Sequence, residues 1–163
     1  MKTLREAAEA HLDDVYGYLA YLTGDRGLAE DLAAETFERA TRLWPRFDER
    51  RGSARTWLCQ LARTVALDHF RSERRRRGRE QAYARGLREV EEPQFAEGLS
   101  PALERALGRL SAADRELLVL RVVLDLEGDA AARVLGISRT ACSTRLSRAL
   151  GKLEKEPRAD VAA

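Results

Sequence analysis

Residues 130–148 read AARVLGISRTACSTRLSRA, and this stretch decides how the C-terminal part of the chain folds. The alanine-rich segment predicts a helix from about Asp129 to Leu135, and Gly136 supplies the left-handed conformation that a sharp helix exit needs. The Ile137 side chain is predicted to be buried in the turn, and Ser138 is a favourable N-cap for a second helix. The stretch therefore predicts a tight helix-turn-helix.

The second of these helices has two different sides. Its predicted inner stripe consists of Cys142, Leu146, Ala149, Leu150 and Leu153. Between Ser138 and Leu153 there are four basic residues and no acidic one. A helix that enters the major groove needs short donors and acceptors for base edges and cations for phosphates. We therefore interpret it as a DNA recognition helix, with the contact residues Ser138, Arg139, Thr140, Ser143, Thr144, Arg145, Ser147 and Arg148. An ordinary helical hairpin with a solvated polar face is the alternative.

Composition limits the class of protein but does not identify it. The 163 residues are 34% charged and 44% hydrophobic, as expected for a folded globular protein, and the formal net charge is only +2. That balance alone gives no argument for a nucleic-acid partner. Cys59 and Cys142 lie in apolar helical patterns and are expected to be buried thiols rather than a disulfide. The sequence contains neither a signal peptide nor an apolar run long enough to span a membrane, so we expect a cytoplasmic protein.

The rest of the chain also repeats at three and four residues, which predicts an all-α fold of two small helical domains joined by a flexible linker. We expect domains at 1–75 and 100–156, a linker at 76–99 and a disordered tail at 157–163. Leu12 is assigned to the inner face of the first helix, and the second helix should end before Pro45. The apolar and capping residues on which this organisation rests are Leu4, Ala8, Val15, Leu19 and Leu22; Leu28, Leu32, Phe37, Ala40 and Leu43; Ser53, Trp57, Leu58, Leu61, Val65 and Ala66; and Ser100, Leu103, Leu107, Leu110, Ser111, Asp114, Leu117, Leu118, Leu120, Val123 and Leu124.

Three longer segments carry a family resemblance. AEDLAAETFERA, followed by LWPRFDERRGSARTWLCQLARTVALDHFRSERR, resembles the second-region domain of bacterial sigma-70 factors of the extracytoplasmic-function (ECF) group. LSAADRELLVLRVVLDLEGDAAARVLGISRTACSTRLSRALGKLE resembles the fourth-region domain of the same family. The resemblance implies a sigma factor that binds core RNA polymerase and directs initiation by recognising the minus-ten and minus-thirty-five promoter elements.

The resemblance also gives roles to side chains in the first domain. Strand opening needs flat side chains for unpaired bases and cations for the backbone. The minus-ten candidates are Phe47, Arg55, Trp57, Arg63, Thr64, His69, Phe70, Arg71, Arg74 and Arg75. An acidic stripe of Glu30, Asp31, Glu35 and Glu38 is expected to dock on polymerase. Trp57 is expected to be largely buried in the core rather than in contact with a base. Thr64 stands where related proteins often have an asparagine beside a flipped-out base.

Two other functions stay open at this stage. One is a helix-turn-helix regulator that binds DNA without polymerase, and the other is a sigma-like adaptor that binds polymerase without melting promoters. An anti-sigma factor is a further expected partner. The terminal Val161-Ala162-Ala163 resembles the ends that unfoldase proteases of the ClpXP type recognise.

The sequence contains no catalytic or cofactor-binding motif. His11 and His69 are far apart and lack cysteine or carboxylate neighbours at metal-ligand spacing, so no metal site is expected. There is no phosphate-cradling glycine loop and no nucleophile motif. We therefore expect a protein that is not an enzyme and needs no cofactor.

Overall fold

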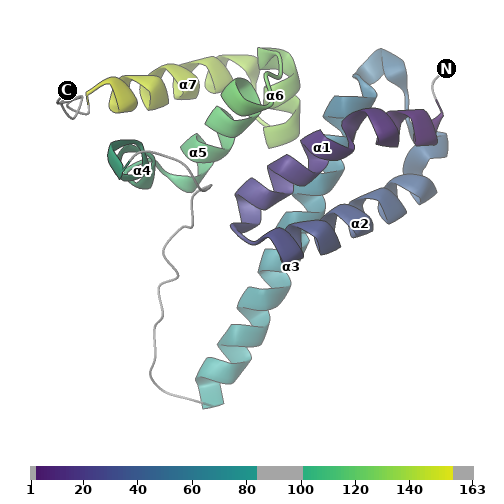
Figure 1. Ribbon diagram of the computed structural model, residues 1–163, viewed down its shortest axis with the longest axis horizontal. Helices are drawn as coiled ribbons and strands as arrows, with labels where there is room; N and C mark the ends of the chain where they lie inside the picture. The colour runs from purple at the N-terminus through teal and green to yellow at the C-terminus, as the bar shows by residue number, and fades with distance from the viewer. Residues whose placement is uncertain (1–2, 84–100, 156–163) are drawn as a thin grey trace.

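The computed structural model describes residues 3–83 and 101–155, and every regular element in these residues is helical. Two groups of helices are present, as predicted (Figure 1). The N-terminal unit contains α1 (Leu4–Thr23), α2 (Arg26–Leu43), the short 3₁₀ turns η1 (Trp44–Arg46) and η2 (Glu49–Arg51), and α3 (Ala54–Tyr83). The C-terminal unit contains α4 (Pro101–Gly108), α5 (Ala112–Leu118), the π-turn η3 (Val119–Val123), α6 (Gly128–Leu135) and α7 (Arg139–Glu154).

Side-chain caps set the boundaries of the first helices. Thr3 and Glu6 form a capping box at the start of α1, and Gly24 ends the helix with φ of 65°. Asp25 then caps α2 by accepting a hydrogen bond from the Leu28 amide at 3.0 Å. Because Gly24 and Asp25 act in succession, α1 and α2 reverse direction within a few residues and pack as a hairpin against α3.

The core of the N-terminal unit is close to the predicted one. Val15, Leu19, Leu32 and Leu58 are buried between α1, α2 and α3. Leu12 was predicted to face inward, but this was wrong: its side chain is half exposed. The buried face of α1 near its middle is completed by Val15 and Leu19, so Leu12 lies at the edge of the helix contact.

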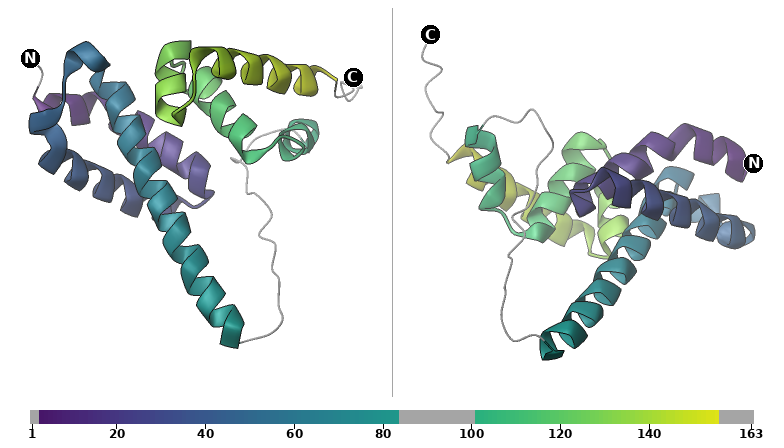
Figure 2. Two further views of the ribbon diagram at one scale, coloured as in Figure 1. Left: turned by 180° about the vertical axis from the view of Figure 1, so that it is seen from behind. Right: turned by 60° about the horizontal axis from the view of Figure 1, so that its bottom comes forward.

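Helix α3 is longer than the apolar pattern indicates. It runs for 30 residues, about 45 Å at the usual helical rise, and its second half protrudes from the unit in both views of Figure 2. The protruding part lies partly within the range that the sequence assigned to a linker. Arginine is a good helix former, and Arg76 pairs with Glu73 at 2.9 Å one turn away. Local propensity and ion pairs therefore maintain a helix that has no apolar stripe.

The C-terminal unit contains the predicted helix-turn-helix. Gly136 ends α6 in the left-handed region, with φ of 66° and ψ of 33°, and the Ser138 hydroxyl accepts a hydrogen bond from the Ala141 amide at 3.1 Å to start α7. Ile137 is partly rather than fully buried. Cys142 and Ala149 lie inward as predicted, whereas Leu150 is exposed.

The helix before this motif differs from the prediction in two ways. The sequence of residues 111–114 predicts a capping box, but only half of it forms: the Ser111 hydroxyl accepts from the Asp114 amide, whereas the Asp114 carboxylate contacts Lys152 at 3.4 Å. The chain then widens into η3, where the Leu124 amide donates to the Val119 carbonyl five residues earlier. This extra residue in the turn rotates Val123 outward, so its predicted inward position was wrong, and its side chain is 73% exposed.

The turn between α6 and α7 gives a stability prediction. Gly136→Ala is expected to lower the free energy of unfolding by about 1–2 kcal/mol, because alanine resists the left-handed conformation although nothing blocks its Cβ. Gly151→Ala is the matched control, since Gly151 lies inside α7 with equally open space, and there alanine should stabilise by up to about 1 kcal/mol. Thermal unfolding measures both, and shifts of the same sign would contradict the assigned role of Gly136.

Candidate nucleic-acid interface

The outer face of α7 is exposed along its length. The predicted contact residues are solvent-exposed on this helix, except that Arg145 is half-buried; those exposed are Ser138, Arg139, Thr140, Ser143, Thr144, Ser147 and Arg148. Cys142 and Ala149 hold the opposite side of α7 in the core. The predicted contact residues other than Arg145 therefore lie on the exposed side of the helix, and their contact with DNA stays a prediction.

One acidic side chain from the neighbouring helix reaches this face. Asp129, in the first turn of α6, lies with its Oδ1 atom 3.4 Å from Nε of Arg139, and both side chains are well exposed. An exposed pair of this kind contributes little to stability. It places a carboxylate beside the guanidinium of Arg139 at the start of α7.

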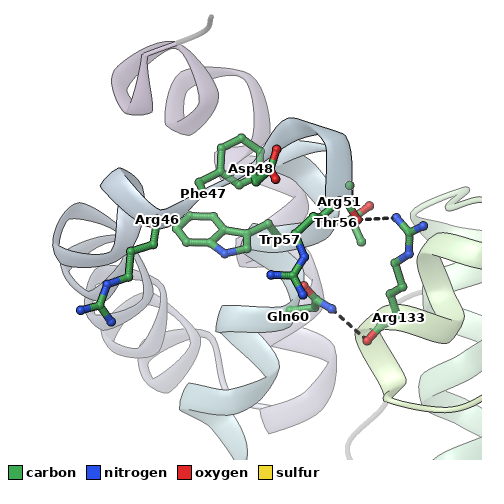
Figure 3. Close-up of a pocket in the computed structure, with 9 residues that line it drawn as sticks. Arg46, Phe47, Asp48, Arg51, Thr56, Trp57, Gln60 and Arg133 are labelled. Atoms are coloured by element: carbon green, nitrogen blue, oxygen red, sulfur yellow. Dashed lines mark hydrogen bonds between the residues drawn. The ribbon is translucent and has the colours of Figure 1, made fainter.

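The second candidate surface contains an aromatic cluster beside a cavity. The rings of Trp44 and Phe47 are stacked with centroids 4.7 Å apart, and Trp57 lies 5.7 Å from the first and 5.3 Å from the second. Phe47 and Trp57 border a cavity of about 410 Å³ together with Arg46 and Arg51 (Figure 3). The remaining lining residues are Asp48, Gly52, Thr56, Gln60 and Arg133. Both Trp57 and Phe47 are half-buried, so each ring packs in the cluster and still reaches the cavity.

A polar stripe continues from this cavity along α3. At 100° per residue, Trp57, Gln60, Thr64, Arg71 and Arg75 share one face of the helix, which we call the α3 face. It begins with an aromatic ring, continues through an amide and a hydroxyl, and ends in exposed arginines. This order suits a strand whose bases stack at one end and whose phosphates meet cations at the other.

The smaller groups on the α3 face have defined positions. The Thr64 hydroxyl donates to the Gln60 carbonyl at 2.9 Å, and Thr64 stands one turn beyond the cavity rather than in its lining. Asp68 lies on the same face, where it pairs with Arg39 at 3.2 Å and with Arg71 at 3.7 Å. This carboxylate reduces the positive charge near the middle of the stripe.

Other minus-ten candidates lie off the α3 face. His69 and Phe70 form an edge-to-face pair with ring centroids 5.9 Å apart, and Arg74 is exposed on another side of the helix. Arg55 and Arg63 point toward the C-terminal unit. The structure therefore brings together only part of the set that the sequence assigned to strand binding.

Arg55 is held by a carboxylate and by a backbone carbonyl. It donates to both carboxylate oxygens of Asp14, at 2.7 and 3.1 Å, and to the carbonyl oxygen of Leu124 in the C-terminal unit. These hydrogen bonds from Arg55 keep the pKa of Asp14 below its ordinary value. Arg55 therefore joins the two units in this arrangement.

Arg63 takes part in a second contact between the units. Its Nε atom donates to Oε1 of Glu116 at 2.8 Å, and the Tyr18 hydroxyl donates to the same oxygen at 2.5 Å. Tyr18 is fully buried and Glu116 is nearly so. Burial, reinforced by the neighbouring carboxylate, raises the pKa of Tyr18 well above its ordinary value, so its hydroxyl remains a donor.

The acidic stripe on α2 is exposed as predicted, but it is not purely acidic. Glu30, Asp31, Glu35 and Glu38 all lie on the outer side of the helix. Arg39 pairs with Glu35 at 3.3 Å, and Arg42 approaches Glu38 at 3.8 Å. The unneutralised acidic part of the surface is therefore concentrated near the start of α2, at Glu30 and Asp31.

The two cysteines and His11 make contacts within the fold. Cys59 and Cys142 are free and buried, as predicted, and burial raises the pKa of the Cys59 thiol to about 12. His11 lies with Nδ1 3.6 Å from the Asp14 carboxylate. Across residues 3–83 and 101–155, no group of three His, Cys, Asp or Glu side chains gathers at metal-binding distance, and no helix is long and apolar enough to cross a membrane.

Sequence reasoning missed several residues of these sites. Trp44, Arg46, Arg51 and Gln60 contribute to the aromatic cluster or its cavity, yet none was a candidate. The closely spaced Trp44 and Phe47 around Pro45 are a local signal that identifies an aromatic loop. Arg133 gave no such signal, because it reaches the cavity only through the packing of α6 on α3.

Comparison with known families assigns both units. The family described as Sigma-70 region 2 matches residues 7–76, and the family described as Sigma-70, region 4 matches residues 100–153. Together they cover most of the chain.

Two sequence relatives agree with this assignment. The chain is 37% identical over 150 residues to the ECF RNA polymerase sigma factor SigC of Mycobacterium tuberculosis, covering 91% of this chain and 80% of the relative. It is 34% identical over 151 residues to the ECF RNA polymerase sigma factor BldN of Streptomyces coelicolor, covering 90% of this chain and 57% of that one.

Solved structures show the same fold. The sigma factor RpoE of Bartonella quintana, in complex with the anti-sigma factor NepR, superposes with a TM-score of 0.69 at 23% identity, covering 96% of this chain and 97% of that chain. CnrH, in complex with the cytosolic domain of CnrY, gives a TM-score of 0.65 at 24% identity, covering 93% and 84%. The chain therefore belongs to the ECF group of the sigma-70 family, the RNA polymerase sigma factors that direct promoter-specific transcription initiation.

Proposed function

We propose that this sigma factor works through three surfaces. The start of α2 docks on core RNA polymerase, the α3 face with its aromatic cavity binds the opened minus-ten strand, and α7 reads the minus-thirty-five element. The observation that carries the proposal is that the α3 face and the outer face of α7 lie in the two units that match regions 2 and 4.

The minus-thirty-five role rests on the chemistry of α7. Arg139, Thr140 and Ser143 stand in its first turns, where a recognition helix meets base edges. Arg148 lies farther along, at a position suited to a phosphate. The Ser138 cap leaves the amino end of α7 with its positive dipole directed outward, which favours a nearby phosphate as well.

The minus-ten role rests on the α3 face. Unpaired bases are stabilised by stacking on aromatic side chains, and Trp57 and Phe47 supply rings at the cavity. Arg46 and Arg51 add cations at the cavity, and Arg71 and Arg75 add them along the helix. His69, Phe70 and Arg74 lie at the side of this path and would contact the strand only at its edge.

Polymerase docking is assigned to α2 because its exposed carboxylates suit a basic partner surface. Glu30 and Asp31 are the strongest candidates, since Glu35 and Glu38 are close to arginines of the same helix. Docking on polymerase also explains how a chain of modest net charge binds DNA. Affinity contributed by one partner raises the effective affinity for the other.

Further partners follow from the relatives. The sigma factor RpoE, a neighbour of the same fold, was solved with the anti-sigma factor NepR, and we propose an anti-sigma partner here too. We place the factor in the cytoplasm and assign it no covalent chemistry of its own. Recognition of the terminal Ala162-Ala163 by a ClpXP-type protease stays a prediction about residues outside the described ranges.

Transcription in vitro tests this function. The full chain is mixed with core RNA polymerase from a related bacterium and a genomic promoter library, and transcript starts are sequenced. The expected result is a set of starts preceded by a shared pair of motifs. Binding without discrete starts would favour the adaptor, and no binding to polymerase would favour the independent regulator, which the family assignment already disfavours.

One substitution assigns the minus-ten motif to α3. Thr64→Asn is expected to change the preferred base at one minus-ten position severalfold and to leave the minus-thirty-five motif unchanged, because Thr64 lies on the α3 face one helical turn beyond the cavity, where an amide could bond an unpaired base. Thr41→Asn is the matched control: the Thr41 hydroxyl makes the same bond to a carbonyl four residues earlier, but on α2. An unchanged minus-ten motif in the Thr64 variant would remove this residue from the site.

A further inference from the structure

The cavity beside the aromatic cluster is rich in positive charge. Its lining includes the guanidinium groups of Arg46, Arg51 and Arg133, and the carboxylate among the described lining residues is that of Asp48. That carboxylate is already paired with Arg50 at 3.1 Å, whereas none of the three lining arginines pairs with a carboxylate within residues 3–83 and 101–155. Like charges that gather without a counter-charge repel one another, so an anion in the cavity would be stabilising.

The arginine that α6 contributes is held at the cavity by a hydrogen bond and accommodated by a glycine. Nη1 of Arg133 donates to the Arg51 carbonyl at 2.7 Å. Gly52 leaves room for this guanidinium, since a Cβ at that position would lie only 3.1 Å from the same Nη1 atom. Arg46 and Arg133 lie on opposite sides of Trp57 (Figure 3). A molecule stacked on this ring would therefore have cations on either side of it.

Two hydrogen-bond acceptors line the same cavity. The nitrogen of the Gln60 side chain donates to the Arg133 carbonyl at 3.0 Å, so the Oε1 atom of Gln60 remains as an acceptor. Hydrogen bonds from Arg50 hold the pKa of Asp48 below its ordinary value, so Asp48 adds a charged acceptor. Acceptors of this kind suit the exocyclic amino group of adenine or guanine.

The size of the cavity fits a molecule larger than a phosphate ion. Its volume of about 410 Å³ lies within the usual range for small-molecule sites, about 300–1,000 Å³. Aromatic rings bind the face of a planar base, and guanidinium groups bind phosphates through paired, charge-assisted hydrogen bonds. A purine nucleotide carries both of these parts in one molecule.

We propose that the cavity binds a free purine nucleotide with two or more phosphates, and that the bound nucleotide excludes the minus-ten strand. The base stacks on Trp57, its amino group donates to Gln60 or Asp48, and its phosphates contact the three lining arginines. The exclusion rests on the proposed function, which assigns the same cavity to the minus-ten strand.

The charge of the cavity favours a free nucleotide over a strand. Each nucleotide of a strand brings one phosphate charge, whereas a nucleoside diphosphate brings two phosphates to the same cations. Both ligands need the rings of Phe47 and Trp57 and the cations of Arg46 and Arg51, so only one of them can be bound at a time. A soluble nucleotide would therefore lower promoter binding as its concentration rises.

Tryptophan fluorescence tests the binding site in the full chain. The chain has two tryptophans, Trp44 and Trp57, and both belong to the aromatic cluster, so the signal reports directly on the cavity. Titration with GDP is expected to quench it saturably, with a dissociation constant on the order of 0.1 mM, as a stacked ring and a few charge-assisted hydrogen bonds support. Guanosine and inorganic pyrophosphate carry only one of the two parts each, and both should bind about tenfold more weakly or worse.

Two substitutions locate the nucleotide in the cavity. Arg133→Ala and Arg46→Ala should each weaken GDP binding about five- to tenfold, because each removes one cation next to the phosphates. Both side chains are exposed, so neither change disturbs the core. Arg46 lies in the N-terminal unit, so its variant tests the cavity independently of α6. Arg148→Ala is the matched control: Arg148 is equally exposed on α7 but lies outside the cavity, and its loss should leave the GDP affinity unchanged.

Promoter binding tests the exclusion. A labelled fragment, carrying a promoter found by the transcription assay, is titrated with holoenzyme in the absence of substrate nucleotides. With about 1 mM GDP, we expect about three- to tenfold weaker binding by the wild type, since a competitor at about ten times its dissociation constant lowers the free fraction about tenfold. The Arg133→Ala holoenzyme contains the same polymerase, so the difference between the two responses to GDP comes from the cavity.

The two assays decide separate questions. A fluorescence signal that GDP does not quench saturably would overturn the nucleotide site, and so would pyrophosphate binding as tight as GDP binding, or a GDP affinity that neither cavity variant changes. GDP binding that leaves promoter affinity unchanged would overturn the exclusion. If the wild type initiates at no promoter, the proposed function fails, and the fluorescence titration still decides whether the cavity binds a nucleotide.

Discussion

Replacing Leu58 with alanine is expected to lower the free energy of unfolding by about 3–5 kcal/mol. Leu58 lies in α3 with no exposed surface, between helices that enclose it on all sides. Its loss removes transfer free energy and leaves a cavity that the surrounding helices close only in part. For a chain of this size the thermal midpoint should fall by roughly 6–20 °C.

Thermal unfolding also tests whether the two units unfold together. Leu120 of η3 is also fully buried and belongs to the same contiguous cluster of buried residues as Leu58. If the two units stay packed together in solution, Leu120→Ala should move the same single transition. Leu150→Ala is the control, because Leu150 is exposed, and its effect should stay below about 1 kcal/mol. Two separate transitions, each sensitive to one variant, would contradict a shared core.

Arg139→Ala is expected to reduce initiation at a two-element promoter by about 10- to 100-fold. Arg139 stands at the start of α7, the proposed recognition helix, and one specific contact between a side chain and a base is worth about 1–3 kcal/mol. The assay is transcription with core polymerase at several salt concentrations, because a lost phosphate contact flattens the salt dependence whereas a lost base contact relaxes the sequence preference.

Lys152→Ala is the control for this variant. Lys152 lies on the same helix and carries the same charge, but its ammonium group is directed to Asp114 at 3.4 Å. Its replacement should change initiation less than twofold. Equal losses in both variants would indicate that α7 contributes only a diffuse positive charge.

The helix-turn-helix was predictable because its signals are local. Gly136 ends α6 and Ser138 starts α7 through conformations and hydrogen bonds that involve residues within a few positions. The exposed face of α7 follows from the helical period once those boundaries are known. The fold class and the candidates on this helix needed no knowledge of the rest of the chain.

The extension of α3 and the outward rotation of Val123 were not predictable in this way. Periodicity detects a helix that packs against something, and the end of α3 is solvated on all sides where its side chains are described. Val123 sits in a π-turn, which shifts the period by one residue. In both places, the spacing of the apolar residues does not indicate the conformation of the backbone.

The contacts between the two units could not be predicted from residues that are neighbours in the sequence. Tyr18 and Glu116 are 98 residues apart, and Arg63 and Glu116 are 53 apart. Arg55 and Arg63 were interpreted as phosphate ligands because exposed arginines in such a protein usually are. Only the folded chain brings their partners, the carboxylates of Asp14 and Glu116 and the carbonyl of Leu124, next to α3.

Covalent connection changes how strong the contact between the units has to be. Two groups on one chain, joined by a segment such as residues 84–100, meet at an effective concentration on the order of millimolar. A set of polar contacts too weak to hold two separate molecules at cellular concentrations is then mostly formed. A single backbone cut between α3 and α4 would abolish this advantage, and the units would part by simple dilution. Proteolysis at that segment would therefore separate the two units irreversibly, and it would also end the linkage between the two proposed promoter-binding surfaces.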